Sequence, residues 1–92
     1  MPVYIVTYDF NREISDADRK RTRDAVLKMD AVQLSESTYG VDTPLNAASL
    51  FDVVKKSLDA NDSLYVLPLD EEGDYRGYHV DEVNAWVGSK LD

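Results

Sequence analysis

Asp9 is the residue of this chain whose type and position best suit catalysis, because it directly follows an apolar run that is typical of a strand. A carboxylate there can bind a hard cation, and Mg²⁺ needs only one or two protein carboxylates because it keeps several of its waters. The bound ion would polarise a phosphate and lower the pKa of water, which is the chemistry of phosphodiester hydrolysis. The competing interpretation is that Asp9 only bonds to its own loop backbone.

A cluster of basic side chains follows Asp9 and could face a phosphate group. Of these, Arg12, Arg19 and Arg23 are the candidate nucleic-acid-binding residues. The alternative is a solvated helix face that neutralises itself, because Asp16 precedes Arg19 by three residues and Lys20 by four, which are ion-pairing distances on a helix. The whole cluster consists of Arg12, Arg19, Lys20, Arg21 and Arg23.

The chain contains no cysteine and one histidine, His79, which narrows the possible chemistry. Thiol catalysis, disulfides and zinc sites built from nitrogen and sulfur ligands are excluded within one chain. We expect His79 to have a surface or capping role. The acidic residues between positions 70 and 74 lack the alternating spacing of a calcium loop, so we expect a solvated turn.

The net charge of −8 is unevenly distributed along the chain. Residues 31–92 hold twelve acidic and four basic side chains, whereas residues 1–30 hold six of each. An acidic surface repels phosphate backbones, so broad, sequence-independent binding of nucleic acid is not expected.

No apolar run approaches the roughly 18 residues that a membrane-spanning helix needs. The segment that starts at Met1 is more typical of a strand than of a signal peptide. We therefore expect a cytoplasmic protein without a membrane association, and the length of 92 residues predicts a single domain over residues 1–92.

Hydrophobic periodicity predicts alternating strands and helices. This order predicts an α+β protein, a ferredoxin-like βαββαβ sandwich with an antiparallel sheet, both helices on one face and a short C-terminal extension. The predicted strands cover residues 3–8, 31–35, 37–42 and 64–67, with a short fifth one at 75–79, and the predicted helices cover residues 16–29, a stripe from 47 to 58, and 81–90.

Four residues give local signals for this arrangement. Ser15 and Asn46 are predicted N-caps of the first two helices. Gly40 inside a strand indicates a bulge or a close approach of another group to the backbone. Pro68 cannot donate to a ladder, which places the fourth strand at an edge or ends it there.

The first and fourth strands are apolar on both faces, so the face opposite the two helices also needs a cover. A two-fold partner is the economical answer and predicts a homodimer. The other answer is that the C-terminal extension folds back, with Trp86 as the plug. The tyrosines at strand positions are expected in the core or an interface rather than stacked on bases; they are Tyr4, Tyr8, Tyr39 and Tyr65.

The strand ends resemble those of known families. Val6-Thr7-Tyr8-Asp9 and residues 62–69 are similar to the first and last core strands of the small CRISPR-associated endonucleases, and the virulence-associated protein D family of toxin ribonucleases shares this plan. Residues 34–43, 61–64 and 73–75 resemble segments of SinR family proteins. The resemblance implies a ferredoxin-like homodimer in which Asp9 is the metal-binding or catalytic residue.

Three hypotheses follow. The first is a nuclease that uses Mg²⁺ or Mn²⁺ and acts on RNA or DNA as a homodimer, with the two Asp9 carboxylates brought together across the two-fold axis. The second is a catalytically inactive dimeric module that binds another protein, from a mobile-element, defence or toxin–antitoxin context. The third is an acidic surface that mimics nucleic acid and blocks a basic site.

Overall fold

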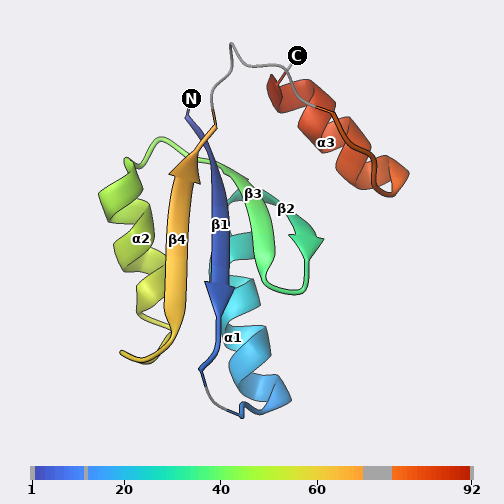
Figure 1. Cartoon of the computed structure of the whole chain (residues 1–92). Coiled ribbons are helices and arrows are strands. Elements are labelled where there is room, and N and C mark those ends of the chain that lie inside the picture. The colour runs from blue at the N-terminus through green and yellow to red at the C-terminus, as the bar shows by residue number, and fades with distance from the viewer. Residues whose placement is uncertain (1, 12, 70–75, 92) are drawn as a thin grey trace.

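The computed structural model describes residues 2–11, 13–69 and 76–91. They form an α+β fold, as predicted, with a four-stranded antiparallel sheet of order β2-β3-β1-β4 and three helices (Figure 1). In chain order the elements are β1 (Val3–Asp9), α1 (Asp16–Leu27), β2 (Asp30–Ser35), β3 (Thr38–Asp42), α2 (Ala47–Lys55), β4 (Ser63–Pro68) and α3 (Asp81–Leu91).

The first two helices begin where the sequence predicts, because a side chain satisfies a free backbone N–H at each start. Ser15 caps α1 by accepting a hydrogen bond from the backbone N–H of Asp18, and Asn46 caps α2 by accepting one from Ser49. Among the described residues, no helix has the length and apolar character needed to cross a bilayer.

The hydrophobic core lies between one face of the sheet and the helices α1 and α2. Tyr4, Val6 and Tyr8 alternate along β1 and are buried there, as is Tyr39 of β3. Three of the four strand tyrosines are therefore core residues, as predicted. The helices contribute side chains one turn apart, for example Leu50 of α2, whose side chain is fully buried.

The opposite face of the sheet is partly covered by α3, which stands apart from α1 and α2 in Figure 1. Trp86 of α3 packs directly against Gly40 of β3, since a Cβ at Gly40 would lie 2.9 Å from Trp86 Cζ3. The close approach predicted at Gly40 is confirmed, and the bulge lies elsewhere, between Gln33 and Ser35 of β2. The C-terminal helix thus acts as the cover that the sequence offered as the alternative to a partner.

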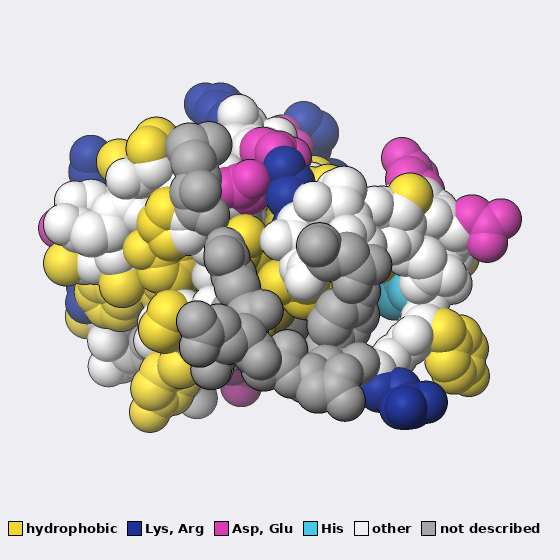
Figure 2. Space-filling view, turned by 90° about the horizontal axis from the view of Figure 1, so that it is seen from above, with side chains coloured by type: hydrophobic (Ala, Val, Ile, Leu, Met, Phe, Trp, Pro, Cys, Tyr) yellow, Lys and Arg dark blue, Asp and Glu magenta, His cyan; other side chains and the backbone are white. Residues whose placement is uncertain are grey.

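This cover leaves the β4 edge of the sheet open. On β4, at one edge of the sheet as Pro68 predicted, Tyr65 and Leu67 remain 67% and 47% exposed. Tyr65 lies opposite Thr7, and Leu67 lies opposite Ile5 of β1. We call these four residues the outer half-face. Figure 2 shows hydrophobic side chains gathered on the side of the molecule where α2 and β4 lie.

Three predicted elements differ from the structure. The helix whose predicted apolar stripe runs from 47 to 58 ends at Lys55, with Lys56 as its C-cap. The helix predicted over residues 16–29 ends at Leu27, with Lys28 as its C-cap. Residues 76–79 form no strand, because the backbone N–H and C=O of His79 are both bonded to the side chain of Asn84 in α3 and are not available to a strand ladder. The remaining position of that predicted strand, Tyr75, lies outside the described residues.

Candidate functional site

Asp9 lies at the end of β1, where the strand pairs with Ser63 of β4. Asp9 is one of the residues that line a small, mostly polar pocket of about 180 Å³, which we call the β1-end pocket. Residues from β1, α1, β2 and the β2–β3 turn line it: Tyr8, Asp9, Phe10, Arg19, Arg23, Gln33, Glu36 and Ser37.

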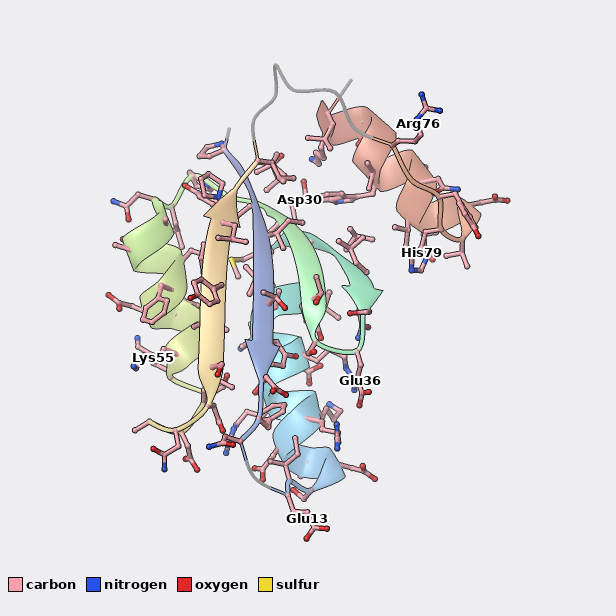
Figure 3. The ribbon with its side chains drawn as sticks, viewed as in Figure 1. Glu13, Asp30, Glu36, Lys55, Arg76 and His79 are labelled. Atoms are coloured by element: carbon pink, nitrogen blue, oxygen red, sulfur yellow. The ribbon has the colours of Figure 1, made fainter. Side chains whose placement is uncertain are left out.

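Two local structures bring these side chains together. The Ser15 cap sets the start of α1, so that Arg19 and Arg23, four residues apart, lie on one face of the helix. The tight β2–β3 turn is held beside β1 by a hydrogen bond of 3.1 Å from the Tyr8 N–H to the Ser37 carbonyl. Glu36 projects from this turn (Figure 3).

The charged groups of the β1-end pocket are only partly paired. The Arg19 guanidinium lies 2.7 Å from the Glu36 carboxylate. Within the described ranges, neither the Asp9 carboxylate nor the Arg23 guanidinium has a hydrogen bond or an ion pair. The interpretation of Asp9 as a residue bonded to its own loop therefore has no support in these ranges.

The other described basic residues of α1 are neutralised within the helix. Lys20 pairs with Asp24 at 2.8 Å, and Arg21 pairs with Asp18 at 3.3 Å. The hydrogen bond from Lys20 lowers the pKa of the Asp24 carboxyl. Acidic residues of α1 therefore neutralise some of its basic residues, as predicted, but the acids are Asp18 and Asp24 and not Asp16. Arg12, the remaining predicted phosphate-binding residue, lies outside the described residues.

The floor of the pocket is aromatic. Tyr8 and Tyr39 join their hydroxyls at 3.1 Å in the core, and the Tyr8 ring meets Phe10 edge to face. Burial and the hydrogen bond to Tyr39 raise the pKa of Tyr8 well above its ordinary value. The phenol stays neutral at physiological pH, so Tyr8 forms part of the aromatic floor of the pocket and does not act as a general base.

A metal ion at this pocket would depend on few protein ligands. No group of three candidate metal-ligating side chains occurs among the described residues. Asp9 is available as a single oxygen ligand, which fits Mg²⁺ or Mn²⁺ with water completing the shell and does not fit zinc. His79 is not a candidate ligand for such an ion, because its ring nitrogen Nε2 is hydrogen-bonded to the Leu34 carbonyl oxygen at 2.9 Å.

A second, larger cavity of about 600 Å³ lies between α3 and the sheet and is lined mainly by apolar side chains, including Ile5, Leu34 and Val87. Arg76 at its rim extends away from the sheet in Figure 3. Its described polar side chains include His79 and Asn84, which are already hydrogen-bonded to backbone groups, so the β1-end pocket is the better candidate for chemistry.

Beside this cavity, three polar contacts attach α3 to the sheet. Trp86 Nε1 donates to Asp30 at 3.0 Å, and the Lys90 ammonium pairs with both Asp30 and Asp42. Asp30 and Asp42 are direct partners across β2 and β3, so Lys90 relieves the repulsion of two facing carboxylates. No local sequence pattern indicates this cluster, since only the strand register brings its members together.

The pocket brings together three residues that the sequence singled out, Asp9, Arg19 and Arg23. It adds Gln33 and Glu36, which the sequence analysis missed. The single residue between the predicted strands 31–35 and 37–42 was the available signal for Glu36, because a residue at so short a connection lies at the same end of the sheet as the end of β1.

No protein-family model matches this chain, and no curated protein shows significant similarity to it. The geometry of the β1-end pocket is therefore the basis for assigning a function to this chain.

Proposed function

We propose that this chain is a ferredoxin-like homodimer that hydrolyses phosphodiester bonds of RNA or DNA with Mg²⁺ or Mn²⁺ held at Asp9. The element order β-α-β-β-α-β and the sheet order β2-β3-β1-β4 support the ferredoxin-like arrangement of two interleaved βαβ units. The observation that carries the function is the pocket that brings Asp9, a carboxylate without a partner among the described residues, together with Arg19 and Arg23 of α1.

Each side chain has a part that its chemistry suits. Asp9 holds the ion, which supplies a polarised phosphate and a water of lowered pKa. Arg23 binds the phosphate of the substrate, because its guanidinium has no ion-pair partner among the described residues. Glu36 orients Arg19 through their ion pair.

The homodimer would supply a second carboxylate. Side chains alternate along a strand, so Asp9 shares a face of β1 with Ile5 and Thr7, two members of the outer half-face. A two-fold contact through the outer half-face therefore brings the two Asp9 residues towards the same axis. Two carboxylates satisfy the ligand needs of Mg²⁺ better than one.

The test is cleavage of labelled single-stranded RNA and double-stranded DNA with Mg²⁺, with Mn²⁺ and with a chelator. The proposal predicts cutting of at least one substrate that stops when the metal is removed. Cutting that continues in the chelator would exclude the metal-dependent mechanism.

A second candidate is a catalytically inactive dimeric module that binds another protein. The exposed Tyr65 and Leu67, together with the net charge of −8, favour this candidate. It predicts no cleavage with either metal and a dimer that persists in the Asp9→Asn variant.

A further inference from the structure

Among the described residues, the β1-end pocket has only one basic side chain without an ion pair. Of the described basic residues of α1, Lys20 and Arg21 are paired with acids of their own helix, and Arg19 is paired with Glu36. Arg23 is the one that remains without an ion pair in the described part of α1. One guanidinium binds one phosphate group and cannot follow a nucleic-acid backbone over several phosphates.

The size of the pocket agrees with a single small group. Its volume is about 180 Å³. This is enough for a phosphate group and its waters but not for a duplex. The aromatic floor is fixed, because Tyr8 is bonded to Tyr39 and packed against Phe10.

The net charge of the whole molecule also favours the binding of a single phosphate group over a long strand. A net charge of −8 repels each further phosphate that a long strand would bring near the surface. A terminal phosphate group carries nearly two negative charges at neutral pH, whereas an internal phosphodiester carries one. The phosphorylated end of a nucleic-acid strand therefore brings the largest negative charge to Arg23, and it brings the fewest additional phosphates that the acidic surface would repel.

We propose that the β1-end pocket recognises one terminal phosphate group through Arg23. The substrate class is then a single strand with a phosphorylated end, and not the interior of a duplex, and a nucleoside monophosphate is the smallest ligand that carries the recognised group. This inference rests on the proposed function, since it names the substrate class of the same pocket. The charges of Asp9 and Glu36 offset those of Arg19 and Arg23, so Mg²⁺ at Asp9 strengthens the binding of the dianion.

Calorimetric titration tests the inference without relying on cleavage. The probes are a nucleoside 5′-monophosphate and two short single-stranded RNAs of one sequence, one with a 5′-phosphate and one with a 5′-hydroxyl, all with chelator present. We expect the 5′-phosphorylated RNA to bind about tenfold more tightly than the 5′-hydroxyl RNA, the range of a charge-assisted contact. Adding Mg²⁺ should tighten the binding of the monophosphate.

Variants of two arginines on the same helix locate the contact. Arg23→Gln should abolish the preference for the 5′-phosphate, and Arg23→Lys should keep part of it because the charge remains. Arg21→Gln is the matched control, since Arg21 pairs with Asp18 and does not line the pocket, and it should keep the full preference. Tryptophan fluorescence of each variant checks that the fold is intact.

Equal affinity of the two RNAs for the wild type, or a preference that survives in Arg23→Gln, would overturn the inference. If the nucleoside monophosphate binds as tightly as the phosphorylated RNA, the ligand is a free nucleotide. If the monophosphate binds much more weakly, the ligand is the phosphorylated end of a strand. Either result supports terminal-phosphate recognition. Failure of the proposed function is a separate outcome, namely phosphate binding at Arg23 without any metal-dependent cleavage.

Discussion

Gly40 is the residue at which the packing of α3 is most sensitive to a single added carbon. A methyl group there would lie 2.9 Å from Cζ3 and 3.2 Å from Cη2 of Trp86, so the indole must move. We predict that Gly40→Ala displaces Trp86 and lowers the free energy of unfolding by about 1–2 kcal/mol, the usual cost of overpacking. Trp86 is the only tryptophan, so its fluorescence reports the displacement directly.

Gly77→Ala is the matched control for this prediction. A Cβ at Gly77 would have no atom within 4 Å, so the tryptophan spectrum and the stability should stay close to those of the wild type. An unchanged spectrum in Gly40→Ala would show that Trp86 does not pack on Gly40 in solution.

The hydroxyl pair of Tyr8 and Tyr39 gives a second prediction at the residue scale. Tyr8→Phe leaves the Tyr39 hydroxyl buried without its partner, which we expect to cost about 1–3 kcal/mol of unfolding free energy. The double variant Tyr8→Phe/Tyr39→Phe removes both polar groups and should be less destabilised than the sum of the two single variants. Urea denaturation of the four proteins measures this, and strict additivity would contradict the pairing.

At the scale of elements, the attachment of α3 should depend on pH. Hydrogen bonds from Lys90 and then Trp86 lower the pKa of Asp30, and bonds to Asp30 and Asp42 raise the pKa of Lys90. The Asp30 contribution is present above about pH 4 and is lost as pH falls through its lowered pKa. The Lys90 contribution is present below about pH 10 and is lost as pH rises through its raised pKa.

We therefore predict that Trp86 fluorescence is constant near neutral pH and shifts towards a solvent-exposed indole at both extremes, before the core unfolds. Lys90→Met should expose the indole already at neutral pH, because Asp30 and Asp42 then face each other across β2 and β3 without a counter-charge. Lys56→Met is the control, since Lys56 is an exposed residue at the end of α2. A wild-type spectrum in Lys90→Met would contradict this account of the attachment.

The elements themselves could be predicted from the sequence because their signals are local. The caps at Ser15 and Asn46 and the apolar stripe of α2 depend on residues within one or two turns, and all are present in the structure. The failed strand at 76–79 depends on Asn84, a contact with α3 that no local pattern contains. The attachment of α3 through Asp30 and Asp42 also requires the strand register.

The candidate site divides in the same way. Asp9 could be predicted because it ends an apolar strand, and Arg19 and Arg23 because helical spacing places them on one face. Their meeting with Glu36 depends on the β2–β3 turn lying beside β1, which is a tertiary contact. The sequence predicted that basic residues of α1 form ion pairs within the helix, but it did not predict which acid each one pairs with, because several acids lie within reach of each basic side chain.

At the scale of the whole molecule, the outer half-face predicts a two-fold dimer. Tyr65 and Leu67 are exposed beside Ile5 and Thr7, an arrangement that a partner can cover. Light scattering should give about twice the mass of one chain for the wild type and the mass of one chain for Leu67→Asp. Val53→Asp introduces the same charge on α2, at another exposed apolar residue, and should remain a dimer.

The central claim is that Asp9 carries metal-dependent cleavage. Its most direct test is the single-turnover cleavage rate of the wild type beside Asp9→Asn, with Asp52→Asn of α2 as an exposed acidic control outside the pocket. We predict that Asp9→Asn lowers the rate by at least about a hundredfold, the scale expected when a catalytic metal loses its ligand, and that Asp52→Asn cuts like the wild type. Cleavage by Asp9→Asn at the wild-type rate would contradict the claim.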